Sequence, residues 1–216
     1  MQCDTKIKLL DHAERLFAEK GIRATSIRDL ASAAKVNVAA VNYHFGSKDG
    51  LMTQVIERRL VPLNQVREER LTLVLSIAES EGRQPKIEDL LRALIEPTFE
   101  FAARLPESQP FLELVGRAMS GTDAQFREIF HRQFEPLFQI LDTATQSALP
   151  HIPPQELRCR LYFAMGSLHS AMRMVGRKDT VLFPTSETSN VPVVTEMVLN
   201  FIASGLRAPC TREGKA

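Results

Sequence analysis

The chain has 216 residues, of which 44% are hydrophobic and 25% are charged, and its formal net charge at pH 7 is +1. This is the composition of a globular protein with a core, and it excludes a wholly disordered chain and a fibrous repeat. The sequence shows no secretory signal pattern, and its most apolar late segment, residues 191–203, falls short of the roughly 20 residues that cross a bilayer. We therefore expect a cytoplasmic protein without a membrane segment, whose three scattered cysteines stay reduced.

Positive charge is concentrated near the amino terminus. The first 60 residues carry ten Lys or Arg and seven Asp or Glu, whereas the remaining residues carry a net charge of −2. A modest excess of this kind is found on proteins that bind an anionic partner, and equally on a solvated face. The charge balance leaves both interpretations open.

Apolar residues recur with a period near 3.6 along almost the whole chain, and no segment alternates like a half-buried strand, so the predicted fold class is all-α. The first helix is expected over residues 4–20, with Asp4 as its cap. Its apolar face would contain Ile7, Leu10, Ala13, Leu16 and Phe17.

A short second helix is expected over residues 26–34, capped by Thr25 or Ser26, with Asp29 near a capping-box position. A third helix begins at Asn37. The two residues between these helices leave room only for a tight turn, which is the spacing of a helix-turn-helix motif.

The third helix has two different faces. Val41 and Phe45 point inward with Val36, whereas the other side is short and polar and contains Val38, Ala39, Asn42 and Tyr43. Such a face suits the major groove of DNA, where small side chains contact methyl groups and an amide can pair with adenine. A helix packed inside a bundle is the alternative interpretation.

Three stretches within residues 7–52 form a pattern without gaps. They are Leu9-Leu10-x-x-Ala13-x-x-Leu16-Phe17-x-x-x-Gly21, Thr25-x-x-x-x-Leu30-Ala31 and Val36-Asn37-x-Ala39-x-Val41-Asn42-Tyr43-His44-Phe45-x-Ser47-Lys48. This pattern resembles the TetR family of bacterial transcriptional repressors. The resemblance implies a homodimer without a cofactor or enzymatic activity. Residues 1–52 would form a three-helix DNA-binding domain, and residues 53–216 a helical domain that binds a small-molecule inducer and the partner subunit.

The resemblance also implies DNA contacts at individual positions. Thr25 resembles a residue that caps the second helix and touches phosphate, and His44 and Lys48 resemble phosphate contacts beside the recognition helix. The family often has Gly at the position of Lys35 and usually has Tyr at that of Asn42, so we assign the phosphate contact to Tyr43 and base reading to Asn42. The full set of expected DNA contacts is Thr25, Ser26, Arg28, Asn37, Val38, Ala39, Ala40, Asn42, Tyr43, His44 and Lys48.

A long fourth helix is expected from Ser47-Lys48 to about Glu79, interrupted by Pro62 and ended by Gly82. Its inward residues would be Met52, Ile56, Leu60, Leu63 and Val66. Further helices are expected over residues 87–104, 110–120, 123–149, 154–177 and 191–206, with a long loop over residues 176–190.

Phe126, Phe130, Phe134 and Phe138 recur every four residues and form either core or the wall of an apolar ligand pocket. The residues expected to line such a pocket are Phe99, Phe111, Arg117, Met119, Phe130, His131, Phe134, Phe138, Tyr162, Met165 and His169.

The segment 148–158 and the helix after it are loosely similar to the fatty-acid-responsive PsrA-like subgroup, which implies a fatty acyl inducer. The last two helices look like the dimerising bundle of the family, so a double-stranded, roughly palindromic operator is expected. Two alternatives stay open. The first is a di-iron helical bundle, because Glu128 and His131 have the spacing of its metal-binding motif, although the sequence holds one such motif where two are required. The second is a helical interaction protein that does not bind DNA.

Overall fold

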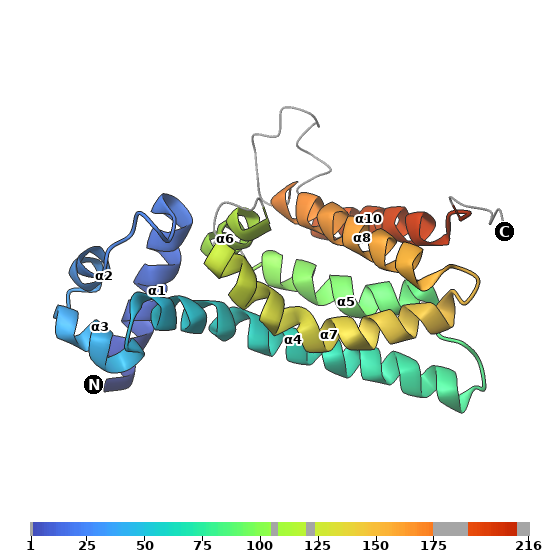
Figure 1. Ribbon diagram of the computed structural model, residues 1–216, viewed down its shortest axis with the longest axis horizontal. Coiled ribbons are helices and arrows are strands. Elements are labelled where there is room, and N and C mark those ends of the chain that lie inside the picture. The colour runs from blue at the N-terminus through green and yellow to red at the C-terminus, as the bar shows by residue number, and fades with distance from the viewer. Residues whose placement is uncertain (1, 105–107, 120–123, 175–189, 211–216) are drawn as a thin grey trace. The chain divides into compact units, whose positions relative to one another are not determined.

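The computed structural model describes residues 2–104, 108–119, 124–174 and 190–210, and every regular element in these ranges is a helix. The predicted all-α class is confirmed. The helices in Figure 1 are α1 (Gln2–Lys20), α2 (Ile27–Ala33), α3 (Val38–Phe45), α4 (Lys48–Ser80), α5 (Ile87–Ala102), α6 (Gln109–Met119), α7 (Ala124–Ala148), α8 (Pro154–Met174) and α10 (Val191–Arg207). The loop expected over residues 176–190 lies outside the described residues except at Asn190.

The chain divides into two compact units by packing. The first comprises residues 1–62 and 106–134, and the second comprises residues 63–105 and 135–216. Helix α6, which packs against α1, and the first part of α7 therefore belong to the same unit as the three amino-terminal helices. The division by function that we expect after residue 52 stays a prediction.

Helix α1 is central to the first unit, where it packs against α2 and α6. Leu9, Ala13 and Phe17 are fully buried, as their spacing predicts. The prediction that Asp4 caps this helix is wrong: α1 already begins at Gln2, since no helix breaker stands before Asp4, whose carboxylate accepts a hydrogen bond from Lys8 at 2.9 Å. Ile7 is 49% exposed, so the apolar face begins one turn later than predicted.

Ser26, not Thr25, is the cap of α2. Its hydroxyl accepts a hydrogen bond from the backbone N–H of Asp29 at 3.1 Å, and the Asp29 carboxylate accepts one from the Ser26 N–H at 2.9 Å, which completes a capping box. The Ser26 hydroxyl also donates to the Asp29 carboxylate at 2.7 Å, and this bond, together with the one from the Ser26 N–H, holds the pKa of Asp29 below its usual value. The start of the helix-turn-helix motif is therefore fixed by local bonds.

The turn between α2 and α3 has the hydrogen bonds of a Schellman motif. The N–H of Val36 donates to the carbonyl of Ala31 at 2.9 Å, and that of Lys35 donates to Ser32 at 3.1 Å. Lys35 adopts a φ of +55°, a conformation that favours glycine. This explains why glycine is frequent at this position in the family that the sequence resembles. Asn37 then caps α3, because its side-chain oxygen accepts from the N–H of Ala39 at 3.0 Å.

Ser47 precedes helix α4, and its hydroxyl accepts from the Gly50 N–H at 3.0 Å; the helix ends before Gly82, whose φ is +62°. Both ends were predicted. Pro62 lies inside the helix. Of the residues predicted to point inward, Met52, Ile56 and Leu60 are buried, Leu63 is half-buried and Val66 is 37% exposed. The prediction for Val66 is wrong, because the apolar stripe of the first half does not continue in register past Pro62.

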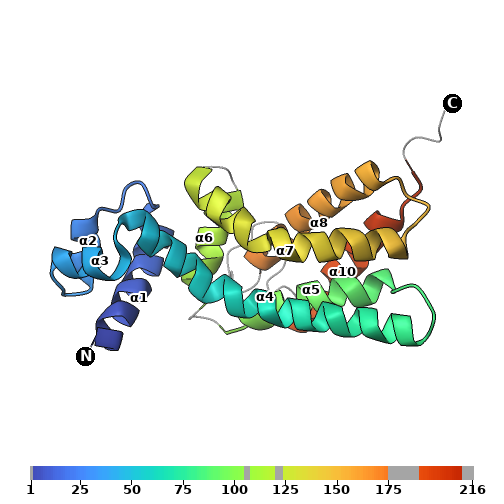
Figure 2. The same ribbon diagram turned by 60° about the horizontal axis from the view of Figure 1, so that its bottom comes forward.

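In the second unit, α10 packs against both α5 and α8, as Figures 1 and 2 show from two directions. Leu90, Val198 and Ile202 belong to this core. Two ion pairs join the first half of α5 to α10: Arg92 donates to Glu196 at 2.6 Å, and Arg207 pairs with Glu88. The two helices are thus joined by apolar packing and by two charged pairs.

Candidate DNA-binding and effector sites

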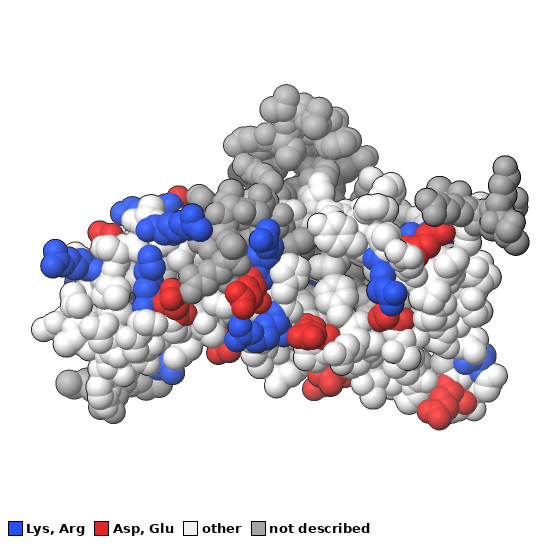
Figure 3. Space-filling view, in the orientation of Figure 1, with Lys and Arg blue, Asp and Glu red and all other residues white. Residues whose placement is uncertain are grey.

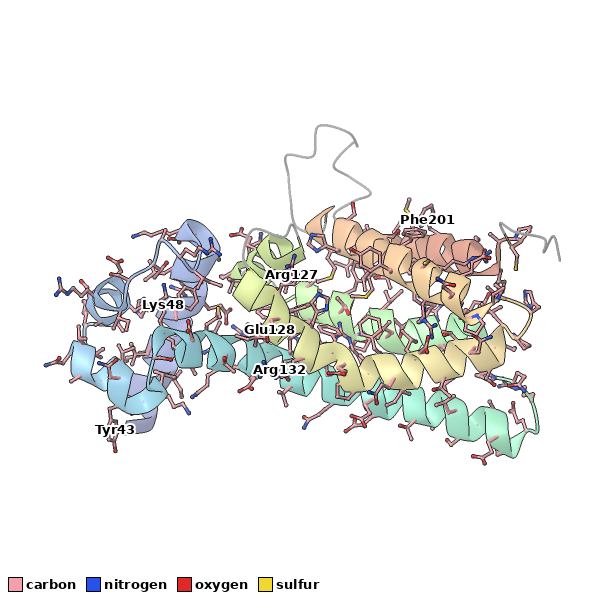
Figure 4. The ribbon with its side chains drawn as sticks, viewed as in Figure 1. Tyr43, Lys48, Arg127, Glu128, Arg132 and Phe201 are labelled. Carbon is pink, nitrogen blue, oxygen red and sulfur yellow. The ribbon has the colours of Figure 1, made fainter. Side chains whose placement is uncertain are left out.

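Helix α3 turns one face to the core and the opposite face to solvent. Val41 and Phe45 are buried at 0% and 7% exposure, whereas Val38, Asn42 and Tyr43 are exposed, Tyr43 at 74%. Tyr43 points away from the rest of the first unit in Figure 4. The predicted division between inward and outward residues is confirmed, and Ala39, also exposed, completes the outward surface. A helix with such a face can enter a major groove.

The C-terminal end of α3 packs closely against the start of α4. The chain turns at Gly46, where φ is +72°, and a Cβ atom added at Gly50 would overlap the carbonyl oxygen of Phe45. Position 50 therefore admits no side chain unless the backbone moves. The recognition helix is held by backbone contact as well as by its buried apolar residues.

Thr25 and Lys48 act within the fold. Thr25 is fully buried, and its hydroxyl donates to the carbonyl of Gly21 at 2.8 Å. The Lys48 ammonium, labelled in Figure 4, donates to the carbonyls of Ile22 and Thr25 at 3.0 and 3.2 Å. The Thr25 hydroxyl is thus used within the fold, and the predicted phosphate contact at this position stays a prediction. Lys48 has three N–H donors and keeps one for phosphate.

The helix-turn-helix segment carries exposed cationic side chains. Arg28 and Lys35 are exposed on α2 and on the turn, and His44 is half-buried with its ring edge-on to Tyr43 at a centroid distance of 5.1 Å. Figure 3 shows several Lys and Arg side chains on the surface of the amino-terminal helices. Side chains of this kind can contact phosphate oxygens.

The predicted phenylalanine ladder of α7 exists as a run of ring contacts. Phe126 and Phe130 stack with centroids 6.2 Å apart, and Phe130 and Phe134 lie 4.7 Å apart. Phe126 and Phe130 are buried, as are Phe99 and Phe111. These residues are core by burial, and whether any of them also faces an effector stays a prediction.

The remaining predicted effector residues divide into three groups. Phe138, Met165 and His169 are half-buried. His131 and Tyr162 are exposed, Tyr162 at 72%, because each lies on the side of its helix opposite the apolar stripe. Their role as pocket residues stays a prediction. The side chains of Arg117 and Met119 lie outside the described residues.

The Glu128 and His131 motif lies on the exposed side of α7. Glu128 pairs with Arg132 at 3.6 Å, and both carry labels in Figure 4. Within the described ranges, no three His, Cys, Asp or Glu side chains come together as a metal site.

An open groove of about 520 Å³ lies along α4 and shares no residue with the predicted pocket; it is lined by Gln65, Glu68, Glu69, Thr72, Leu73 and Ser76. Over the described residues, no helix has the length and hydropathy of a membrane span.

Two buried charged residues were not anticipated from the sequence. Glu14 has only 3% of its side chain exposed, and Arg67 donates to Thr98 Oγ1 at 2.5 Å and to the Leu94 carbonyl at 3.2 Å. Burial lowers the pKa of Arg67 to about 10. The signal at Glu14 was its place among apolar neighbours, since Leu10, Ala13 and Phe17 lie on the same side of α1.

These features define a helix-turn-helix protein whose recognition helix faces solvent and whose carboxyl-terminal part is helical. Residues 9–55 match the model of the bacterial regulatory proteins of the tetR family, and residues 92–205 match that of the tetracyclin repressor-like C-terminal domain. The chain belongs to the TetR family.

Two relatives match this chain over part of their length. The probable HTH-type transcriptional regulator YttP of Bacillus subtilis is 43% identical over 56 residues, which is 26% of this chain and 27% of that protein. The HTH-type transcriptional repressor Rv3405c of Mycobacterium tuberculosis is 34% identical over 111 residues, which is 50% of this chain and 56% of that protein. The chain thus spans between about a quarter and somewhat more than half of these relatives.

Solved structures agree over nearly the whole chain, although their sequence identity is low. The probable transcriptional regulatory protein RHA5900 superposes with a TM-score of 0.62 at 20% identity, covering 94% of this chain and all of that one. The regulator FadR from Bacillus subtilis, in complex with stearoyl-CoA, gives 0.62 at 14% identity over 92% and 98% of the two chains. At such identities the likeness establishes the fold.

Proposed function

We propose that the protein is a ligand-responsive transcriptional regulator, acting as a repressor in the cytoplasm, that binds a palindromic operator as a homodimer and is released by a small hydrophobic inducer. The observation that carries this proposal is the solvent-facing side of α3, which is made of short side chains and an amide. The opposite side of this helix is buried, and its C-terminal end contacts the backbone at Gly50. Residues 1–52 would bind DNA, and residues 53–216 would bind the inducer and the partner subunit.

Within the DNA-binding domain, base reading falls to the outward face of α3. Asn42 is exposed at its centre and has an amide that can accept from N6 and donate to N7 of adenine, while Val38, Ala39 and Ala40 can contact thymine methyl groups. Ser26, Arg28, Asn37, Tyr43, His44 and Lys48 would contact phosphates. The side chains of Ser26 and Asn37 already serve as caps, so their contribution would be limited to their remaining hydrogen-bonding capacity.

Selection of DNA from a random duplex pool tests this proposal. The selected sites should contain two inverted half-sites whose centres lie one helical turn, or a multiple of it, apart. Affinity should fall with salt at a log-log slope of about −0.9 per phosphate contacted. Asn42→Ala should relax the preference at one position of each half-site, at a cost of about 1–3 kcal/mol. Failure to select any sequence, together with a flat salt profile, would exclude DNA binding.

Homodimer formation is favoured by an apolar surface on α8 and α10. Phe163 and Tyr162 on α8 are exposed at 67% and 72%, and Met197 and Phe201 on α10 at 63% and 68%. Phe201 is labelled in Figure 4 on the outer side of α10. A Cβ atom at Gly166 would meet nothing within 4 Å in this chain, so close packing inside the protomer does not explain the glycine. A second copy of the same surface would cover these rings.

Sedimentation measurements test the dimer. Phe201→Glu should place a charge in the interface and leave a monomer at micromolar concentration. Phe201 makes up part of the surface and not of the core, so the melting temperature of the separated protomer should be little affected. A Phe201→Glu protein that stays dimeric would place the interface elsewhere.

For the inducer, we propose a long-chain fatty acyl compound. The support is the apolar, aromatic character of Phe111, Phe130 and Phe134 in the first unit, together with the loose sequence similarity of segment 148–158 to fatty-acid-responsive regulators. The solved FadR structure contains stearoyl-CoA, which is a property of that protein. Mass spectrometry of small molecules released from the purified protein, followed by titration of the protein–operator complex with stearoyl-CoA and with stearate, would test the assignment. If neither acyl compound weakens operator binding, the inducer belongs to another class.

A further inference from the structure

Glu14 is a buried carboxylate on α1 that accepts three hydrogen bonds from two arginines of α4. Arg58 Nη2 donates to Glu14 Oε2 at 2.6 Å, and Arg59 donates from Nε to Oε2 and from Nη2 to Oε1, each at 3.0 Å. The two parallel bonds of Arg59 are the directional, charge-assisted kind. Glu14 is thus bound by two arginines that follow it in the sequence by 44 and 45 positions.

Arg58 extends this cluster to a second carboxylate. Its Nη1 donates to Asp11 Oδ1 at 2.6 Å, and Asp11 is 49% exposed at the rim. Burial lowers the pKa of Arg58, but the hydrogen bonds to Glu14 and Asp11 outweigh burial and raise the pKa overall. The guanidinium therefore stays charged. We call Asp11, Glu14, Arg58 and Arg59 the α1–α4 clamp.

The clamp lies on one side of Pro62, and a second set of arginine contacts lies on the other. The first compact unit ends at Pro62 in α4. In the second unit, Arg67 bonds to Thr98 and Leu94 of α5, and Arg70 donates to Glu100 at 3.0 Å. Helix α4 is thus fastened to a different helix in each unit. Pro62 supplies no backbone N–H, so it is where the helix resists bending least.

We propose that Glu14 is a positioning residue for operator recognition. By fastening residues 58–59 of α4 to α1, it joins the first part of α4 and the recognition helix α3 into one rigid body, so that changes in the separation of the two recognition helices of a dimer arise at Pro62. This inference rests on the proposed function, because it concerns how a dimer meets two half-sites.

The expected effect follows from bivalent binding. A rigid dimer that engages two half-sites gains about 10²–10⁴ in affinity over one half-site, provided that its geometry matches their spacing. If α4 could slide on α1, each recognition helix would sample a range of positions. The dimer would then lose part of this gain and accept half-sites at more than one spacing.

The experiment compares Glu14→Gln with Asp4→Asn on DNA selected by the wild-type protein. Asp4 is a matched control, because it is also an α1 carboxylate in an ion pair, but it pairs with Lys8 on its own exposed surface. Affinity is measured for a single half-site, for the full operator, and for operators with one base pair added or removed between the half-sites. Glu14→Gln should lower full-operator affinity about tenfold or more, leave half-site affinity within about twofold, and flatten the dependence on spacing. Asp4→Asn should behave as wild type.

Two results would overturn the proposal. In the first, Glu14→Gln keeps the wild-type dependence on spacing. In the second, half-site affinity falls by the same factor as full-operator affinity, which shows that Glu14 acts only on the fold of the DNA-binding helices. Should Glu14→Gln fail to fold, Asp11→Asn removes one rim contact of Arg58 and should give a smaller change of the same kind, and an unchanged spacing dependence in that variant would also overturn the proposal. Failure of the wild-type protein to select any DNA would instead refute the proposed function.

Discussion

Replacing Lys35 with glycine should stabilise the protein, although it removes a charged side chain from the turn of the helix-turn-helix motif. Lys35 has a φ of +55°, and a residue with a Cβ atom pays about 1–2 kcal/mol to adopt this left-handed conformation. Glycine avoids that cost but loses about 0.5–1 kcal/mol through its greater freedom in the unfolded chain. The net gain expected for Lys35→Gly is therefore about 0.5–1 kcal/mol.

Thermal and urea unfolding of Lys35→Gly and Lys35→Ala measure this effect. Both variants remove the ammonium, but alanine keeps the Cβ atom and with it the strain, so only the glycine variant should gain stability. For a chain of this length the gain corresponds to a rise in melting temperature of about 1–4 °C. The backbone hydrogen bonds from Lys35 and Val36 should persist in both variants, because they involve no side-chain atoms. Equal stability of the two variants would show that the turn is not strained at this position.

Three further predictions concern stability. Ser26→Ala should destabilise the protein by about 1 kcal/mol in urea unfolding, because it removes the α2 cap, whereas Ser26→Asp should retain most of the stability. Phe99→Ala should cost about 3–5 kcal/mol, since Phe99 is 1% exposed, and a cost below 1 kcal/mol would contradict its place in the core. Hydrogen bonding from Arg207 lowers the pKa of Glu88 from 4.5, so this pair contributes stability above that pH and loses it as the pH falls through the lowered value. The urea midpoint should accordingly drop more steeply with acid in wild type than in Glu88→Gln.

The helix boundaries could be predicted because local chemistry sets them. Ser26 with Asp29, Asn37, Ser47 and Gly82 each act through bonds to residues no more than four positions away, and such bonds are encoded in short stretches of sequence. The outward face of α3 was predictable for a similar reason. The spacing of Val41 and Phe45 fixes the buried side, and the opposite side follows from helical geometry.

The contacts between distant helices could not be predicted in this way. Periodicity shows that α1 has an apolar face, but not that Glu14 on that face meets Arg58 and Arg59. Likewise the spacing of the phenylalanines of α7 places them on one side of the helix, while the exposure of His131 and Tyr162 depended on which neighbours cover α7 and α8. Burial of a side chain is a property of the packed structure. A helical repeat shows which side chains share a face of the helix, but it does not show which of them a neighbouring helix covers.

The close approach of Gly50 to the carbonyl of Phe45 means that the residues that place α3 differ from those on its outward surface. Its placement depends on backbone and on Val41 and Phe45, none of which is on the outward side. The outward positions 38, 39, 42 and 43 can therefore be exchanged as a cassette without disturbing the scaffold. A library randomised at these four positions should yield variants that recognise new operators while folding as the parent does, which would make this chain a convenient starting point for retargeted genetic switches.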